Sequence, residues 1–451
     1  MTFPHPETHL LELLDSDLDF HDQDSLYASH NFHAFPAKFP PQLPRLFIQS
    51  LTGPGDVVLD PMSGSGTTIL EAVLAGRQAI GCDIDPLAIK IIQGKTTPLD
   101  PELVSRTGKE ILANASDAVH HGRELLQSYI QESWDDASRR FIDEWFDKDT
   151  QVELAALIRA INQIDDEAVQ NFFQLAFSAI IITKSGGVSL ALDLAHTRPH
   201  RPKIIMRKGE VLEGHDLAAK SDGSLRHLTK ILRSPLEEFE KRYKNNIKGL
   251  LSLHPDLGQS RMLFGNAQQL PLPSNSVDLI VTSPPYASNA IDYMRAHKFS
   301  LVWLGYPIAD LGNKRKEYIG GENLKDFPFI KLPSFPTSVV VDITGLDSKK
   351  GQTLHRYYTE MTYVLREMYR VLRPGKVAIV VVGSSVMRGQ DTQTQTCLAE
   401  IGRAIGFVVP KIGTRNLDRD RRMLPAGFRV NYASQIQQRM HEEYVIGFYK
   451  P

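Results

Sequence analysis

Residues 277–286, VDLIVTSPPY, join an apolar strand to a turn whose residue types suit chemistry on an amino group. Two consecutive prolines fix φ and remove two amide donors, which stiffens the turn and leaves its carbonyl groups pointing outward. The Ser283 hydroxyl and the Pro284 carbonyl can therefore hold the two hydrogens of an amino group that is conjugated to a ring. This would favour the pyramidal nitrogen whose lone pair attacks an electrophilic methyl group, and Tyr286 adds a face on which a flipped base can stack. The alternative is a rigid turn with a tyrosine in the core.

Residues 59–68, LDPMSGSGTT, place a glycine-rich turn between a short buried strand and an amphipathic run that predicts a helix. Gly64 and Gly66 would let the backbone adopt positive φ angles and approach a ligand closely. The first amides of the following helix would then meet a negatively charged group. Asp83 ends the next predicted strand, close to where a carboxylate receives ribose hydroxyls in dinucleotide-type folds. These features predict a cofactor site that begins at Asp60, the end of the first strand.

Two departures from known phosphate-binding turns narrow the choice of cofactor. A P-loop needs a lysine after its last glycine, whereas two threonines follow Gly66, and Ile69 replaces the third glycine of the dinucleotide fingerprint. S-adenosylmethionine, which has an amino-acid tail and no pyrophosphate, fits this turn better, although a generic nucleotide-binding turn remains the alternative. Asp83 and Asp85 have no further ligands beside them in the sequence, so they predict a sugar contact and a helix cap rather than a metal site.

Together, DPMSGSGTT and TSPPY resemble the motifs of the DNA amino-methyltransferases. In that family a tetrapeptide that begins with Ser is typical of cytosine-N4 enzymes, whereas Asp or Asn at that place is typical of adenine-N6 enzymes. The resemblance implies transfer of a methyl group from S-adenosylmethionine to cytosine N4 in double-stranded DNA, after base flipping. It also implies a role in restriction-modification or other host marking, with a cognate restriction endonuclease as a possible partner. The catalytic residues implied are Ser283, Pro284, Pro285 and Tyr286.

Three further segments extend the resemblance to both ends of the chain. Residues 30–43, HNFHAFPAKFPPQL, resemble the family segment that helps to cradle the methionine end of the cofactor. Residues 367–383 resemble the helix and strand that wall the target-base pocket, and residues 441–450 resemble the closing strand. Asn266 stands where the family usually has an acidic residue near the adenine ring, and its amide can still pair with the adenine edge. The cofactor-binding residues implied are Phe35, Lys38, Asp60, Pro61, Gly64, Ser65, Gly66, Thr67, Asp83 and Asn266.

The order of elements predicts one interrupted sheet. A strand-turn-helix-strand pattern spans residues 56–82, and a mainly helical stretch, in which strand alternation is rare, follows at 101–253. The α/β pattern resumes at 277–281 and continues with a helix at 357–371, a Pro-Gly turn and strands at 377–382 and 443–449. We therefore predict an α/β fold, a Rossmann-like methyltransferase sheet interrupted by a large, mainly helical insertion. The expected parts are 1–99 (cofactor-binding half), 100–260 (helical insertion, possible target recognition region) and 261–451 (catalytic half).

A DNA-binding surface must come from local clusters of cations, because the net charge is only −2. Residues 184–208 read as basic loops within the insertion, and they are our choice for target recognition. Two other basic clusters lie at 295–316 and 415–422, and charge runs of this kind can also be plain solvated surface. The DNA-binding residues expected are Lys184, Ser185, Arg198, His200, Arg201 and Lys203 in the insertion and Arg421 near the last strands.

The two cysteines argue against methylation of cytosine C5, which needs a thiolate nucleophile. Cys82 lies on a predicted buried strand and Cys397 on a predicted helix, and neither follows a proline in a catalytic loop. The acidic first residues do not resemble a secretion signal, and no apolar run reaches the length of a membrane span. We therefore expect a cytoplasmic protein without a metal and without a membrane partner.

Three alternative functions remain open from the sequence. The cofactor motif precedes the catalytic motif with a long insert between them, an order best known among adenine enzymes, so an adenine-N6 DNA methyltransferase is the nearest rival. An RNA methyltransferase is a second, because related folds with a Pro-Pro-Tyr turn modify RNA, although no aromatic RNA-binding segment is recognised. The third is a catalytically inactive DNA-binding protein with this fold, against which the intact motifs argue.

Overall fold

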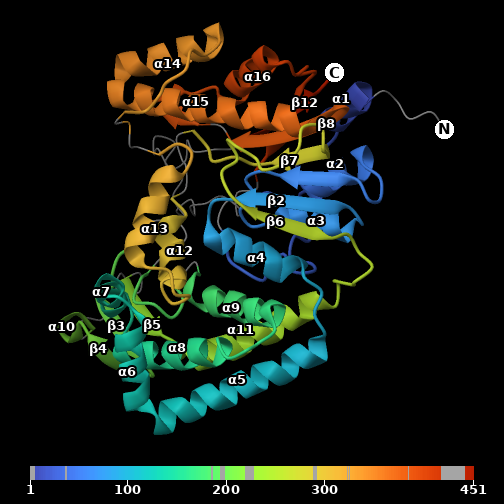
Figure 1. Cartoon of the computed structure of the whole chain (residues 1–451). Coiled ribbons are helices and arrows are strands. Elements are labelled where there is room, and N and C mark those ends of the chain that lie inside the picture. Colours follow the sequence, from blue (N-terminus) through green and yellow to red (C-terminus); the bar gives the residue numbers. More distant parts are fainter. Residues whose placement is uncertain are drawn as a thin grey trace.

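Seven strands form one central sheet in the order β11-β12-β8-β7-β1-β2-β6 in the computed structural model (Figure 1). The strands are β1 (Val57–Asp60), β2 (Gln78–Asp83), β6 (Ser260–Phe264), β7 (Val277–Thr282), β8 (Leu372–Gly383), β11 (Ile412–Asn416) and β12 (Glu442–Tyr449). The first five run parallel to one another, and β12 pairs antiparallel with both β8 and β11. The structure describes residues 6–35, 38–183, 186–192, 194, 199–218, 228–287, 292–321, 324, 326–383, 385–417 and 442–451.

Helices cover both faces of this sheet, because the central strands are apolar on both sides. In β7, Val277 and Ile280 pack into the core on one face, whereas Leu279 and Val281 pack into the core on the other. One face is covered by α1 (Pro6–Asp15), α2 (Gln42–Leu51) and α3 (Thr67–Leu74), and the other by α14 (Ser334–Leu346), α15 (Ser348–Val371) and α16 (Thr394–Ile405). The predicted α/β class is therefore confirmed.

A second group of helices lies together in the lower part of Figure 1, between α4 (Pro86–Thr96) and β6 in the chain. It comprises α5 (Pro101–His121), α6 (Arg123–Ser133), α7 (Asp136–Trp145), α8 (Lys148–Ile161), α9 (Glu167–Ile181), the short α10 (His215–Ala218) and α11 (Pro235–Leu250). Leu154, Leu157, Ile158 and Ile161 are buried in its core, as their helical spacing predicts. Among the described residues, no helix is both long and apolar enough to cross a membrane.

Two details differ from the sequence prediction. Residues 204–207, expected to be part of a loop, form β3 (Ile204–Arg207), which pairs with β4 (Glu210–Glu213) and β5 (Thr229–Leu232) in a small sheet. The strand has only four residues and lies among cations, so its pairing with the adjacent β4 and with β5 identifies it. The expected Pro-Gly turn at 374–375 is instead an irregularity within the continuous strand β8, where Gly375 has a φ of 76°.

The helical group also receives residues from after the insertion. Phe299 on α12 (Met294–Leu301) contacts the rings of Phe141 and Trp145, with ring centroids 5.1 and 5.2 Å apart. Leu311 on α13 (Ile308–Lys314) is buried in the same core. The segment that follows the TSPPY turn therefore packs on the insertion, which places the turn where the sheet and the helical group meet.

Candidate functional site

A pocket of about 980 Å³, including the space that opens to solvent, lies at the carboxyl ends of β1, β2, β6 and β7. Ligands of open parallel sheets bind at this edge. Two predicted catalytic residues, Ser283 and Pro285, line it, but Pro284, Tyr286 and Gly66 do not. The predicted cofactor residues that line it are Phe35, Lys38, Asp60, Pro61, Gly64, Ser65, Thr67, Asp83 and Asn266.

The glycine-rich turn is folded tightly against the end of β2. Gly64 and Gly66 have φ angles of 49° and 74°, in the left-handed region that glycine adopts without strain. The Gly64 amide donates a 2.7 Å hydrogen bond to Asp83 Oδ2, and the Ser63 hydroxyl donates one of 2.7 Å to the Asp60 carbonyl. Asp83 therefore braces the turn and faces the pocket at the same time.

Replacing Gly66 with alanine is expected to lower the free energy of unfolding by about 2–4 kcal/mol. A Cβ at this position would lie 2.5 Å from Ile92 Cγ1, so overpacking adds to the strain of the left-handed φ. Gly76 is the matched control, because its φ is 76° and a Cβ there meets nothing within 4 Å. Denaturant unfolding of both variants measures the difference, and equal losses would contradict a close packing role for Gly66.

Three carboxyl groups meet at this end of the sheet. Burial raises the pKa of Asp60 to about 7 and the pKa of Asp83 to about 6, and the neighbouring carboxylates add to both shifts. Asp85 caps α4 by accepting a hydrogen bond from the Leu87 amide, as expected for a helix cap. Burial opposes its ionisation, but His297, whose Nδ1 lies 2.5 Å from Asp85 Oδ2, helps to lower its pKa overall.

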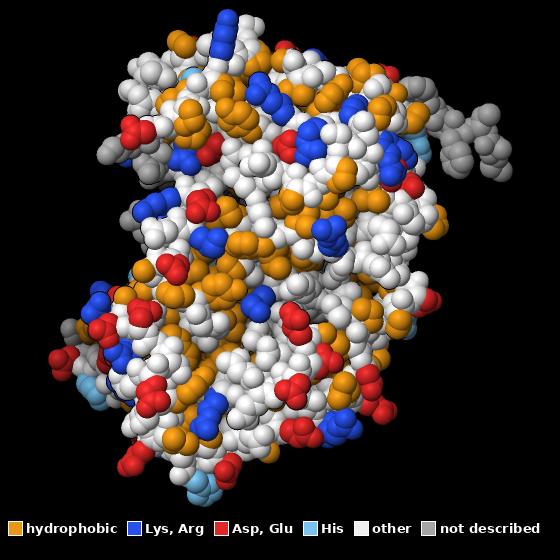
Figure 2. All heavy atoms as spheres, in the orientation of Figure 1, with side chains coloured by type: hydrophobic (Ala, Val, Ile, Leu, Met, Phe, Trp, Pro, Cys, Tyr) orange, Lys and Arg blue, Asp and Glu red, His pale blue; other side chains and the backbone are white. Residues whose placement is uncertain are grey.

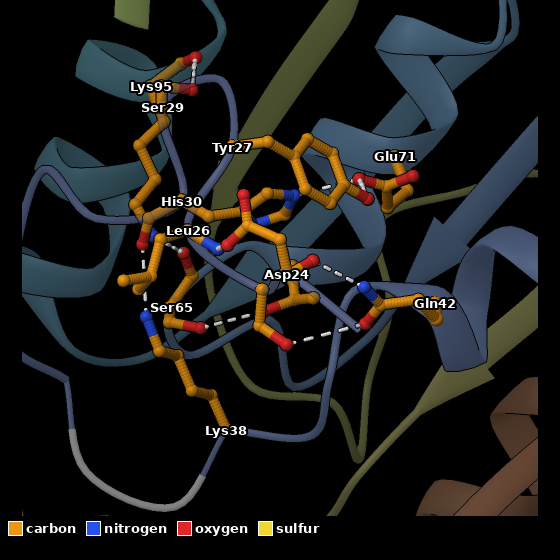
Figure 3. A network of polar contacts seen from close by, with 12 residues as sticks. Asp24, Leu26, Tyr27, Ser29, His30, Lys38, Gln42, Ser65, Glu71 and Lys95 are labelled. Carbon is orange, nitrogen blue, oxygen red and sulfur yellow. Dashed lines mark hydrogen bonds and ion pairs between the residues drawn. The ribbon is translucent and has the colours of Figure 1, made fainter. Parts of the chain in front are cut away.

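The segment before β1 is held beside the glycine-rich turn by buried polar contacts (Figure 3). Glu71 on α3 receives hydrogen bonds from the Tyr27 hydroxyl at 2.6 Å and from His30 Nε2 at 2.7 Å. Lys95 Nζ on α4 donates a 2.7 Å hydrogen bond to the Ser65 carbonyl. Lys38 Nζ donates to the His30 carbonyl and lies at the pocket wall, where its charge can meet an anionic ligand group.

Several pocket residues were not identified from the sequence. The Tyr293 ring stacks on Phe35, with centroids 5.0 Å apart, and the Tyr318 hydroxyl donates a 3.0 Å hydrogen bond to Asp85 Oδ2. Both tyrosines follow the TSPPY turn without a motif of their own, so only the folded chain brings them here. The other unpredicted lining residues are Phe39, Met62, Ser63, Ile84, Asp85, Gly265, Ala267, Glu317 and Ile319.

The expected DNA-binding residues are only partly described. His200, Arg201 and Lys203 are exposed on the helical group, but Arg201 forms a 2.8 Å ion pair with Glu213. Lys184, Ser185, Arg198 and Arg421 lie outside the described residues. On the face shown in Figure 2, Lys and Arg side chains are interspersed with Asp and Glu, so this face carries no continuous basic surface.

Two other basic clusters contain residues that are not on the surface. His297 has no exposed side chain and contacts Asp85, and Lys298 lies over the Phe141 ring. Arg415 is 4% exposed and pairs with Glu443. A buried carboxylate far away in the sequence therefore holds His297 and Arg415 inside the fold, whereas Lys298 is partly exposed.

Neither cysteine is suited to act as a nucleophile. Cys82 on β2 and Cys397 on α16 are both buried. Burial raises the pKa of the Cys82 thiol to about 12 and that of Cys397 to about 11, which disfavours the thiolate. Within the described ranges, no group of three or more His, Cys, Asp or Glu side chains is arranged to hold a metal ion.

Comparison with known proteins agrees with the motifs. Residues 18–94 match the family model N6_N4_Mtase, described as DNA methylase. The chain is 24% identical over 431 residues to the Type II methyltransferase M.MvaI of Kocuria varians, covering 88% of this chain and 87% of that protein. It is 23% identical to the Type II methyltransferase M.BsoBI of Geobacillus stearothermophilus, covering 85% and 80%. The rRNA methyltransferase aviRa of Streptomyces viridochromogenes aligns at 11% identity over 96% of each chain, with a TM-score of 0.31.

The family model spans the glycine-rich turn and both strands that flank it, and the two Type II relatives extend the similarity over most of the chain. Residues of both motifs, among them Ser283, Asp60 and Gly64, line one pocket at the sheet edge where such folds bind ligands. These findings support the amino-methyltransferase family that the motifs resemble, with S-adenosylmethionine as its methyl donor.

Proposed function

We propose that this protein transfers a methyl group from S-adenosylmethionine to the N4 amino group of cytosine in double-stranded DNA. The observation that carries the proposal is the shared pocket, in which Ser283 of the TSPPY turn lies together with Asp60, Gly64 and Asp83 of the cofactor end. A methyl donor bound by the cofactor end would therefore present its methyl group close to Ser283.

S-adenosylmethionine supplies an electrophilic methyl group on a sulfonium. The protein therefore has to bind and orient this donor and to exclude water from it. The Ser283 hydroxyl and the Pro284 carbonyl accept hydrogen bonds from the target amino group, which turns its lone pair toward the methyl group. The bound donor would supply the methyl group, whose S–C bond would break as the N–C bond forms, and the surplus proton of the amino group would pass to solvent. Asp83 accepts hydrogen bonds from the ribose hydroxyls, and Lys38 pairs with the cofactor's carboxylate.

The choice of cytosine rests on Ser283, since a tetrapeptide beginning with Ser is typical of cytosine-N4 enzymes in the family that the chain resembles. The Type II methyltransferases to which it is similar support a role in restriction-modification. A cognate restriction endonuclease as a partner is part of the proposal. Because His200 and Lys203 are exposed, the helical insertion remains our candidate for target recognition. The base would be flipped out of the duplex to reach Ser283.

The affinity for S-adenosylmethionine is expected to fall as the pH drops from 8 to 5. The cofactor carries a positive sulfonium and donates ribose hydroxyls, so it favours ionised carboxylates, whereas burial raises the pKa of Asp60 to about 7 and of Asp83 to about 6. Protonation of Asp83 alone would reduce the affinity about tenfold between pH 7 and pH 5. Calorimetry across this range measures the affinity. In Asp83→Asn the loss of affinity near pH 6 should disappear, and an affinity that does not change with pH would contradict the role of both carboxyls.

Without the cofactor the same shifts act on stability in the opposite direction. A carboxyl whose pKa is higher in the folded chain binds protons that the unfolded chain releases, so Asp60 and Asp83 lower the free energy of unfolding as the pH rises from about 4 to about 7. The cofactor-induced rise in melting temperature should accordingly be larger at pH 8 than at pH 5.5.

Transfer of labelled methyl groups to DNA and to RNA tests the proposed reaction. We expect label in DNA from a methylation-free host and none in RNA. Label only in RNA would overturn the substrate class, and binding of DNA without any transfer would favour an inactive DNA-binding protein.

A further inference from the structure

Tyr286, the last residue of the TSPPY turn, is fixed by a carboxylate on the closing strand. Its hydroxyl donates a 2.8 Å hydrogen bond to Glu443 Oε1. Glu443 lies on β12, opposite Gly383 at the end of β8 on one side and opposite Arg415 on β11 on the other. The contact therefore joins the turn after β7 to β12, two strands away in the sheet and 157 residues away in the chain.

Glu443 is itself held from the other side. Arg415 Nη1 donates a 2.5 Å hydrogen bond to Glu443 Oε2, and Arg415 Nε donates to the Leu18 carbonyl at 3.1 Å. Arg415 and Glu443 are only 4% and 7% exposed. A buried carboxylate that is paired in this way keeps its position, because separation of the pair would leave an uncompensated charge in the fold.

The hydroxyl of Tyr286 donates its hydrogen to Glu443, and the Ser283 side chain is a second hydrogen-bonding partner of this hydroxyl. Burial, together with the negative charge of Glu443, raises the pKa of the Tyr286 hydroxyl well above its ordinary value. A phenylalanine at this place would stack on a base equally well, but its ring would have no polar anchor. The hydrogen bond thus gives the tyrosine hydroxyl a use that stacking alone does not require.

We propose that Glu443, held by Arg415, is a positioning residue that fixes the ring of Tyr286 for the incoming target base. The proposal rests on the proposed function, in which Tyr286 stacks on the flipped base. A ring whose torsions are set before the base arrives loses less conformational freedom on binding, and the amino group then meets Ser283 in the productive geometry.

A double-mutant cycle tests the proposal with Tyr286→Phe, Glu443→Gln and the double variant. Tyr286→Phe leaves the Glu443–Arg415 pair intact. In Glu443→Gln the amide oxygen would face Arg415 and the NH₂ group would face the tyrosine, which thereby loses its charged acceptor. Each single change is expected to lower the single-turnover rate of methyl transfer about tenfold at saturating cofactor and DNA. The rate of the double variant should be no lower than that of the slower single variant, and the affinity for the cofactor should be unchanged in all three.

Tyr444→Phe is the matched control. It removes a hydroxyl–carboxylate contact from the same strand, the 3.3 Å bond from Tyr444 to Glu442, and adjacent residues of a strand face opposite sides of the sheet. Its rate should stay close to that of the unchanged protein, whereas Tyr286→Phe should be about tenfold slower.

Full activity of Tyr286→Phe, or losses of the two single changes that multiply in the double variant, would overturn the positioning role alone. If Glu443→Gln does not fold, the rates of Tyr286→Phe and Tyr444→Phe still test the positioning role. The rate is read from whichever methylated nucleoside forms, so the test does not depend on the identity of the base. An unchanged protein that transfers no methyl group to DNA would instead overturn the proposed function, and the positioning role with it.

Discussion

Replacing Ser283 with alanine is expected to lower the rate of methyl transfer by about 100- to 1,000-fold, the usual effect of removing one preorganised hydrogen-bonding group from a reaction centre. The Ser283 hydroxyl is the side-chain acceptor that the TSPPY turn presents in the shared pocket. Without it, one hydrogen of the target amino group has no partner, and the nitrogen lone pair stays conjugated to the ring. Calorimetry should show little change in the affinity for S-adenosylmethionine, because Asp83 and the glycine-rich turn are untouched.

Ser276→Ala is the control for this change. Ser276 precedes the same strand at its opposite end, and its hydroxyl donates only to the Pro273 carbonyl. Single-turnover rates of the two variants, measured on the same DNA, isolate the effect of the hydroxyl at the pocket. A Ser283→Ala variant that is as fast as Ser276→Ala would remove Ser283 from the chemistry.

Replacing Asp83 with alanine is expected to weaken the binding of S-adenosylmethionine about 100-fold, since charge-assisted hydrogen bonds contribute roughly 1.5–3 kcal/mol each. The carboxylate accepts hydrogen bonds from the amides of Gly64 and Asp85, at 2.7 and 2.9 Å, while it faces the pocket. Its loss would therefore remove the acceptor for the ribose hydroxyls and also loosen the glycine-rich turn.

Asp83→Asn separates these two effects. Its amide oxygen can still accept from Gly64, but the negative charge and one acceptor are lost. We expect an affinity between those of the unchanged protein and Asp83→Ala, and a melting temperature without cofactor that is nearer to the unchanged protein. Calorimetry tests whether Asp83 contacts the ribose. An affinity for S-adenosylmethionine that is unchanged in Asp83→Ala would exclude this contact.

The sequence was most informative where local pattern determines structure. The glycines of the turn, the strand before Ser283 and the carboxylate at the end of β2 are each recognisable within about one turn and one strand of chain. Because parallel strands place their carboxyl ends at one edge, the sequence could also predict that these residues meet. In the folded chain Asp60, Gly64, Asp83 and Ser283 line one pocket.

The rest of the site depends on contacts between distant segments, which no local pattern encodes. His297 reads as one member of a basic run, but the fold buries it against Asp85. Arg415 likewise reads as a surface cation, yet it pairs with Glu443 behind Tyr286. In both cases the partner carboxylate is fixed by the sheet, and only the folded arrangement shows that the cation is structural.

Identification of the methylated nucleoside tests the central claim most directly. DNA from a methylation-free host would be incubated with the protein and S-adenosylmethionine, digested to nucleosides and analysed by mass spectrometry. We predict N4-methylcytosine, absent when Ser283→Ala replaces the unchanged protein. N6-methyladenine would contradict the choice of base while keeping the chemistry, and the absence of any methylated nucleoside would contradict the assignment as a DNA methyltransferase.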